Sequence, residues 1–221
     1  MILFHYLNVF LHTPAYWHGQ DSVGQRLVQH LEYTGIVLVI ATVLAFPLGC
    51  LTGHTGRGGS FVSVLAVTAR ALPTFGVLVL LTVLMGIGFL PVAIPLTALA
   101  VPPILLATHV GIRGVDPAVV DAARGVGMRP RQILLQVEIP AALASILNGL
   151  RSATVQIVAT ATIAAFVSFG GLGRYIADGL SEYDYAQVVG GAVIVALLSI
   201  AVLGVFAVVS RLAVSPGIRA R

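Results

Sequence analysis

Few residues in this chain could do chemistry, because its 221 residues include eight acidic side chains and twelve basic ones that are all arginine. The absence of lysine excludes a Walker A phosphate loop, a Schiff-base lysine and a protein-kinase lysine, since each of these sites needs an ammonium group. The glycine-rich run at 53–60 (GHTGRGGS) therefore predicts a tight turn. The scattered histidines and the single cysteine, Cys50, do not form a metal-ligand pattern. We expect no catalytic residue, no metal and no cofactor bound by this chain.

The polar segment 121–140 (DAARGVGMRPRQILLQVEIP) is the most informative part of the sequence. Its pattern predicts a helical stretch, a glycine break and a second amphipathic helix. Just before it, Asp116 and Pro117 form an N-cap followed by a first-turn proline. A short surface helix of this kind can give a soluble partner a rigid lever. The same pattern also suits an interfacial helix that packs against its own bundle.

Two arginines, Arg70 and Arg151, lie inside apolar stretches. An arginine at the depth of a membrane costs at least about 2.5 to 3.5 kcal/mol, so each must snorkel, pair or face water. They could shape a pathway. Alternatively, Arg151 could anchor a helix near the cytosolic side, and Arg70 could bond to a carbonyl freed near Pro73.

The elements that must position these residues are membrane-spanning helices. The chain is 58% hydrophobic and 9% charged, with a mean hydropathy of +1.01, far from the composition of a soluble domain. Spans of about 20 apolar residues are expected at 33–53, 61–85, 92–110, 140–168 and 187–213. The second is interrupted by Arg70 and Pro73, and three prolines predict that the third is bent or broken. The fold class is therefore an all-α integral membrane protein with about five transmembrane helices.

We divide the chain into an N-terminal interfacial segment at 1–30, a membrane domain at 31–213 with a polar loop at 116–140, and a tail at 214–221. Positive residues favour the cytosolic side. With five spans and the N-terminus outside, eight arginines lie inside, and Arg26 and Arg174 lie outside. The polar loop and the tail are therefore expected in the cytosol. The net charge of +4 follows from this retention of arginine and does not indicate nucleic acid.

The spacing within the polar loop resembles a known family. Asp121-Ala122-Ala123, three residues, Gly127, nine residues and Val137-Glu138-Ile139-Pro140 are similar to the cytoplasmic EAA loop of type I ABC importer permeases, E-A-A-x3-G-x9-I-x-L-P. Asp121, Val137 and Ile139 depart from that pattern but keep its charge or apolar character. Further motifs resemble the permeases for osmoprotectants, the glycine betaine, carnitine and choline importers: Arg70-Ala-Leu-Pro-Thr, Gly111-Ile-Arg-Gly-Val-Asp-Pro, Gly149-Leu-Arg-Ser-Ala-Thr-Val-Gln, Ala159-Thr-Ala-Thr and Gly170-Gly-Leu-Gly.

The resemblance implies a mechanism and a set of partners. The EAA loop would form a coupling helix in a groove of a separate cytoplasmic ABC ATPase, which would hold the ATP and Mg. Gly125 and Gly127 would permit a turn, and Pro140 would start the fourth span. Arg124, Arg129 and Arg131 would contact the rim of the ATPase groove.

The family also implies a substrate-binding protein outside the membrane and a second permease subunit, either identical or a sister chain, in a bacterial cytoplasmic membrane. Aromatic rings hold quaternary ammonium ions. We therefore take Phe75 and Phe166, with Thr160 and Thr162, as candidate pathway residues; Phe89, Phe169 and Tyr175 are further aromatic candidates.

Two other classes remain as alternatives. An ion-gradient-coupled transporter or channel would be expected to keep carboxylates or histidines inside its spans, and only His109 lies near a span end. A membrane enzyme would need paired catalytic groups at one depth, and no such groups converge in this sequence.

Overall fold

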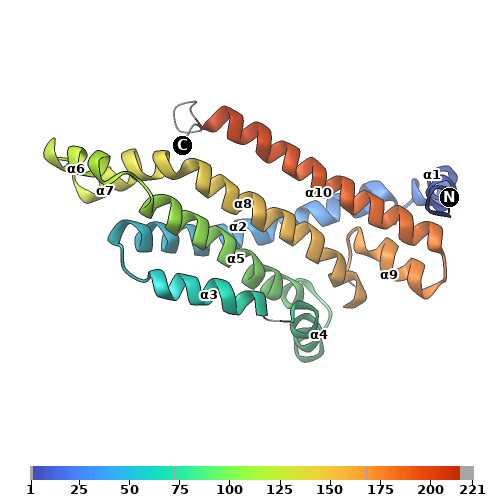
Figure 1. Cartoon of the computed structure of the whole chain (residues 1–221). Coiled ribbons are helices and arrows are strands. Elements are labelled where there is room, and N and C mark those ends of the chain that lie inside the picture. Colours follow the sequence, from blue (N-terminus) through green and yellow to red (C-terminus); the bar gives the residue numbers. More distant parts are fainter. Residues whose placement is uncertain (1, 72, 168, 215–221) are drawn as a thin grey trace. The chain divides into compact units, whose positions relative to one another are not determined.

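The structure is a computed structural model that describes residues 2–71, 73–167 and 169–214, without the side chains at 69 and 70. The described residues form helices and no strand (Figure 1). The elements are α1 Ile2–His12, η1 Pro14–Tyr16, α2 Val23–Thr55, α3 Gly59–Ala71, α4 Thr74–Met85, α5 Phe89–Arg113, α6 Pro117–Gly125, α7 Pro130–Ile133, η2 Leu134–Glu138, α8 Ile139–Ala161, η3 Thr162–Val167, α9 Gly173–Ser181 and α10 Tyr185–Ala213. Of the expected tail at 214–221, residues 215–221 lie outside the described residues.

Four helical runs in the described residues are long and apolar enough to cross a membrane: α2, α5, Pro130–Val167 and α10. The expected second span is two shorter apolar helices, α3 and α4. Pro73, which has no backbone N–H to donate, immediately precedes α4 as its N-cap. The interruption expected at this proline is therefore a helix boundary.

The structure changes two expectations about the helices. The helix that contains the expected first span, 33–53, extends beyond it at both ends, since α2 runs from Val23 to Thr55. The third span is not broken, because α5 is one continuous helix through its prolines, as membrane helices allow where neighbours and side chains satisfy the freed carbonyls.

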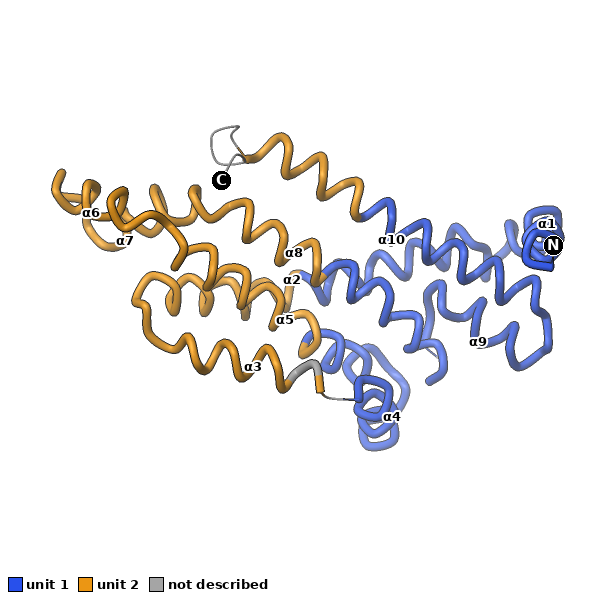
Figure 2. The backbone as a smooth tube through the Cα atoms, viewed as in Figure 1, with its two compact units in different colours: residues 1–38, 73–97, 154–202 blue, residues 39–72, 98–153, 203–221 orange. Residues whose placement is uncertain are grey.

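The chain divides into two units, coloured separately in Figure 2. Unit 1 contains residues 1–38, 73–97 and 154–202, and unit 2 contains residues 39–72, 98–153 and 203–221. Helices α2, α5, α8 and α10 each contribute residues to both units. Each unit is described below by itself.

In unit 2, small residues bring α5 and α8 into close contact. Ala107 and Gly111 of α5, four residues apart, meet Gly149 and Ser145 of α8, also four apart. A Cβ on Gly149 would lie 2.5 Å from Ala107 Cβ, and one on Gly111 would lie 2.7 Å from Ser145 Cβ. Ser145 Oγ donates a hydrogen bond of 2.8 Å to the Ala107 carbonyl. Small residues at this spacing let helix backbones approach where lipid supplies no hydrophobic driving force.

Small residues also allow close packing of α2 on α5 in unit 2. A Cβ on Gly49 would lie 2.6 Å from Thr108 Cβ, and one on Gly53 would lie 2.8 Å from Ile112 Cβ. Beside this contact, a buried cluster holds the helix ends together, formed by Cys50, Ile112, Ala142 and Ile146. Cys50 is 6% exposed and carries a free thiol.

Unit 1 has a core of aromatic residues from α1, α9 and the start of α10. Phe10 of α1 is 1% exposed and lies against Gly190 of α10. Its ring stacks on Tyr16 and meets the edge of Tyr175. A Cβ on Gly191 would lie 2.6 Å from Tyr175 Cβ, so this glycine lets α9 pack closely on α10. The N-terminal residues are thereby tied to the C-terminal helix.

Candidate functional site

The polar loop at 116–140 begins with a capped helix. Asp116 is the N-cap of α6, and its side-chain oxygen accepts a hydrogen bond of 2.9 Å from the Ala118 N–H. Pro117 occupies the first helical position. Both features were predicted from the sequence and are confirmed. They satisfy orphan donors at the start of α6 and fix its first turn.

Gly127 ends α6 in a Schellman motif. The Met128 N–H donates to the Ala123 carbonyl at 3.2 Å, and the Gly127 N–H donates to the Arg124 carbonyl at 2.9 Å. Gly127 has a φ of +84°, which side chains with a Cβ rarely adopt. Gly125, by contrast, is the last residue of the helix and has no positive φ. The turn between the two predicted helices therefore depends on Gly127 alone.

The second helix of the loop starts at Pro130 and runs without a break into α8. The Arg129 N–H donates to Gln132 Oε1 at 2.8 Å, which caps its start. A π-helical turn, η2, follows at Leu134–Glu138, and α8 continues from Ile139. The expectation that Pro140 starts the fourth span is therefore corrected. Pro140 is the second residue of α8, and the helical path reaches it through the wider π turn.

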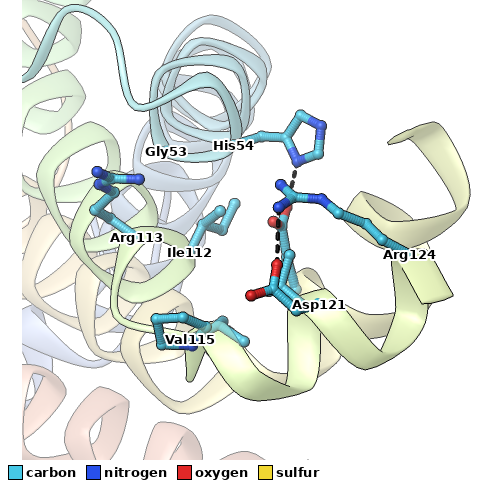
Figure 3. A pocket seen from close by; sticks show the side chains of 10 residues that line it. Gly53, His54, Ile112, Arg113, Val115, Asp121 and Arg124 are labelled. Carbon is cyan, nitrogen blue, oxygen red and sulfur yellow. Dashed lines mark hydrogen bonds and ion pairs between the residues drawn. The ribbon is translucent and has the colours of Figure 1, made fainter. Parts of the chain in front are cut away.

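A cavity of about 330 Å³ lies in unit 2 between the ends of α2 and α5, α6 and η2. In its wall His54 Nδ1 lies 2.6 Å from Glu138 Oε2, and the Glu138 side chain is only 7% exposed. Figure 3 shows Asp121 and Arg124 of α6 pointing toward the end of α2 that carries His54. A buried carboxylate needs such a partner. The contact ties the end of α2 to the second helix of the polar loop.

The outer surface of the polar loop is exposed and positively charged. Asp121 pairs with Arg124 at 3.0 Å, but both side chains are more than 60% exposed, so this pair adds little stability. Ala122 is exposed, whereas Ala123 is 8% exposed and faces inward. The remaining arginines of the loop, Arg129 and Arg131, are exposed. Large apolar side chains are exposed among these charges: Val119, Val126 and Leu135.

Of the two arginines expected inside spans, Arg151 is well described. It lies in α8, is exposed in the isolated chain, and forms no ion pair with any residue that the structure describes. The side chain of Arg70, in α3, lies outside the described residues. Within 2–71, 73–167 and 169–214, no cluster of three or more His, Cys, Asp or Glu side chains could hold a metal ion.

The structure brings together two of the four predicted pathway residues. Phe75 of α4 and Phe166 of η3, in unit 1, have ring centroids 6.3 Å apart in an edge-to-face arrangement. Phe75 is 48% exposed and Phe166 is 50% exposed, so neither ring is core. Thr162 Oγ1 donates to the Ala159 carbonyl at 2.7 Å. Thr160 is partly buried.

The other aromatic candidates separate into two environments in unit 1. Phe89 and Phe169 lie 6.5 Å apart and both contact Tyr33, with Tyr33 and Phe169 centroids 4.5 Å apart. Tyr175 is 4% exposed and belongs to the aromatic core of unit 1 instead. A buried core ring has no free face for a solute.

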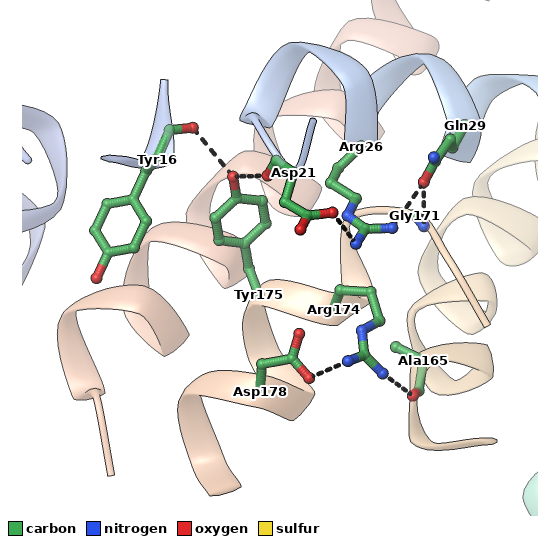
Figure 4. A network of polar contacts seen from close by, with 9 residues as sticks. All are labelled: Tyr16, Asp21, Arg26, Gln29, Ala165, Gly171, Arg174, Tyr175 and Asp178. Atoms are coloured by element: carbon green, nitrogen blue, oxygen red, sulfur yellow. Dashed lines mark hydrogen bonds and ion pairs between the residues drawn. The ribbon is translucent and has the colours of Figure 1, made fainter. Parts of the chain in front are cut away.

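A polar network joins the segment before α2 to α9 in unit 1 (Figure 4). Tyr175 Oη donates to the Asp21 and Tyr16 carbonyls, at 2.7 and 3.1 Å. Arg26 pairs with Asp21 at 2.5 Å and donates to Gln29 Oε1, which also accepts the Gly171 N–H. These bonds fix the glycine turn before α9.

Asp184 caps the start of α10 in unit 1. Its Oδ1 accepts the Ala186 and Gln187 N–H groups at 3.0 and 3.1 Å, and its Oδ2 accepts Tyr16 Oη at 2.5 Å. Partial burial alone would raise the pKa of Asp184, but these three hydrogen bonds outweigh it and hold that pKa below its usual value of 3.8. Burial and the hydrogen bond to Asp184 raise the pKa of Tyr16.

Sequence reasoning missed the His54–Glu138 contact because the two residues are 84 positions apart. Glu138 was seen only as a member of the loop motif, and His54 only as part of a glycine-rich turn. The one available signal was an acidic residue at the start of an apolar run, where a buried carboxylate must find a partner.

Comparison with known proteins agrees with this arrangement. The family described as "Binding-protein-dependent transport system inner membrane component" matches residues 45–220. The choline transport system permease protein OpuBB of Bacillus subtilis is 32% identical over 207 residues, covering 94% of this chain and 93% of that protein. The glycine betaine/carnitine/choline transport system permease protein OpuCB of the same organism is 34% identical, with coverages of 90% and 94%.

Solved structures show the same fold. An inward-facing structure of the MetNI methionine ABC transporter contains a chain that matches with a TM-score of 0.74 at 22% identity, covering 85% of this chain and 94% of that one. An amino acid ABC transporter crystallised with histidines matches with a TM-score of 0.71 at 18% identity, with coverages of 93% and 97%. The chain therefore belongs to the family of binding-protein-dependent transport system inner membrane components, and within it groups with the permeases of osmoprotectant ABC importers.

Proposed function

We propose that this chain forms the membrane pathway of an importer for quaternary ammonium solutes such as glycine betaine, choline or carnitine. The solute class is taken from the relatives in Bacillus subtilis, a choline permease and a glycine betaine/carnitine/choline permease, which match nearly the whole chain at 32–34% identity. The exposed Phe75–Phe166 pair supports this class, because aromatic faces attract quaternary ammonium ions. A binding protein outside the membrane would deliver the solute.

The polar loop couples the pathway to a separate cytoplasmic ABC ATPase in this proposal. The observation that carries it is the rigid form of the loop: a capped α6, a Schellman turn at Gly127, and a second helix that continues into α8. Movement imposed on α6 would reach the spans through this continuous helix. ATP and Mg would bind to the partner, because the chain has no lysine for a phosphate loop.

The pathway would lie between this chain and a second permease subunit, identical or a sister chain, in the bacterial cytoplasmic membrane. The arginine distribution supports an orientation with the polar loop in the cytosol and the N-terminus outside. In this orientation the exposed arginines of the loop face the ATPase: Arg124, Arg129 and Arg131.

The test is uptake of radiolabelled glycine betaine into proteoliposomes that contain the chain with its ATPase and a loaded binding protein. We expect uptake that requires ATP and Mg on the loop side and persists when ionophores abolish all ion gradients. Uptake that stops with ionophores but not with ATP removal would instead establish the ion-gradient-coupled transporter. The same preparation with the binding protein omitted is the control for delivery.

A further inference from the structure

One face of α8 in unit 2 is polar where a membrane-spanning helix should be apolar. Asn148, Arg151 and Ser152 lie within one helical turn and are all exposed in the isolated chain. The residues on the packed side of the same stretch are small or apolar and buried: Ala142, Ile146, Gly149 and Ala153. The helix thus has a core side and a polar side.

The polar face lies deep in the span. Arg151 is about 18 Å along the axis from Ile139, the start of a helix that is about 35 Å long, at 1.5 Å per residue. The hydrocarbon core of a bilayer is about 30 Å thick. With the fourth span at 140–168, as expected from the sequence, the guanidinium is too far from the membrane surface to reach it by simple snorkelling, even though helix side chains lean toward the N-terminal, loop-bearing end of α8.

Lipid cannot be the surroundings of this face. An arginine has five N–H donors and is always charged, and Arg151 forms no ion pair with any described residue of its own chain. Such a group faces the interior of an assembly or a water-filled cavity. The most apolar span, α10, shows the opposite pattern and exposes Val205, Val208 and Leu212.

We infer that the face of Asn148, Arg151 and Ser152 lines the solute pathway, and that Arg151 binds the carboxylate of a zwitterionic solute such as glycine betaine or carnitine. This inference rests on the proposed function and deepens it. A guanidinium matches a carboxylate with two parallel hydrogen bonds. Choline has the quaternary ammonium group but no carboxylate, so Arg151 offers it no attraction and repels its charge. The residue would therefore favour betaines over choline within the pathway.

Thiol labelling tests the location of the face without requiring transport. Cys50 is the only cysteine and is buried, so Cys50→Ala gives a background without a reactive thiol. In this background Asn148→Cys and Ser152→Cys retain Arg151, and Val205→Cys is the control, because Val205 is 61% exposed on the apolar surface of α10 where we expect lipid. We expect a charged, membrane-impermeant methanethiosulfonate to label positions 148 and 152 in the assembled transporter at least tenfold faster than position 205. Equal, slow labelling of all three would overturn the inference.

The ratio of two uptake rates tests the role of Arg151. In Arg151→Gln proteoliposomes we expect glycine betaine uptake to fall about 10- to 100-fold, the effect of losing a charge-assisted hydrogen-bond pair, while choline uptake stays within about threefold of wild type. Arg151→Lys keeps the charge and should recover part of the betaine rate. An equal loss of both solutes would show a structural role, such as pairing with the second permease, and would refute carboxylate binding. If the wild-type protein carries neither solute, the proposed function fails, whereas the labelling result still decides where the face lies.

Discussion

Replacing Gly149 by alanine should destabilise unit 2 by a predictable amount. The new Cβ would lie 2.5 Å from Ala107 Cβ and 2.8 Å from the Pro103 carbonyl oxygen. Carbon atoms normally approach to about 3.5–4.0 Å, so α5 and α8 would have to separate by about 1 Å. Overpacking of this kind costs about 1–3 kcal/mol. Alanine also has a higher helix propensity than glycine, which by itself would stabilise the helix by about 0.5–1 kcal/mol.

A matched control separates these two effects. Gly204 is also inside a helix, α10, and a Cβ there would meet nothing within 4 Å. Gly204→Ala should therefore gain only the stability that comes from the higher helix propensity of alanine. The difference in unfolding free energy between Gly149→Ala and Gly204→Ala then isolates the steric cost, which we expect to be about 1–3 kcal/mol. Reversible unfolding of the purified chain in detergent mixed with sodium dodecyl sulfate measures both.

A second substitution tests whether the cost arises at the proposed contact. Ala107→Gly removes the methyl group that the new Cβ meets but leaves the Pro103 carbonyl in place. The double variant should therefore recover part of the loss, with a favourable coupling of about 1 kcal/mol in a double-mutant cycle. Strictly additive effects, or a Gly149→Ala variant as stable as Gly204→Ala, would refute the close α5–α8 contact.

Three further predictions concern Gly127 in the polar loop, the His54–Glu138 contact, and Asp184, which caps the start of α10. Gly127→Ala should lower ATPase copurification and reduce the free energy of unfolding by about 1 kcal/mol, because alanine is strained at a φ of +84°. The control is Gly125→Ala: Gly125 lies in a helix and faces open space, so this variant should leave both copurification and the unfolding midpoint unchanged. Glu138→Ala should lower the thermal midpoint of the transporter by removing the buried partner of His54, and a midpoint equal to wild type would contradict that contact. Because folding lowers the pKa of Asp184, the stabilisation from this carboxylate is complete above its unfolded pKa near 3.8 and is lost as the pH falls through the lower folded pKa. In Asp184→Asn the thermal midpoint should therefore fall less steeply between about pH 5 and 3 than in wild type, and an unchanged slope would contradict this role.

The sequence predicted the elements whose signals are local. The α6 start followed from Asp116 and Pro117, because an N-cap and a first-turn proline act within one turn. The turn at Gly127 followed from a glycine between two amphipathic patterns. The interruption at Pro73 followed from its missing N–H.

The errors arose where tertiary context decided the outcome. Pro140 reads as a helix start, but the π turn at Leu134–Glu138 carries the helix through to it. The prolines of α5 predicted a bent or broken helix, and the structure excludes the break, since α5 is continuous. The interfacial segment expected at 1–30 stays a prediction; the structure adds that His30 Nε2, within α2, lies 3.0 Å from the Val158 carbonyl.

The candidate site was predictable as a segment but not as a set of contacts. The loop motif located 116–140, whereas the pairing of His54 with Glu138 needed the fold to bring the end of α2 to η2. The exposure of Arg151 likewise could not be predicted from the sequence, because it depends on how α8 packs against the other helices.

The central claim is that the loop at 116–140 transmits the work of a separate ATPase to the spans. The most direct test is affinity purification of the chain from its native membrane, wild type beside Gly127→Asp, with mass spectrometry of the associated proteins and measurement of ATP hydrolysis. We predict that an ABC ATPase accompanies the wild-type chain, that a betaine-loaded binding protein stimulates its hydrolysis, and that Gly127→Asp loses both while remaining in the membrane. A wild-type chain that purifies without an ATPase and carries solute down an ion gradient would contradict the claim.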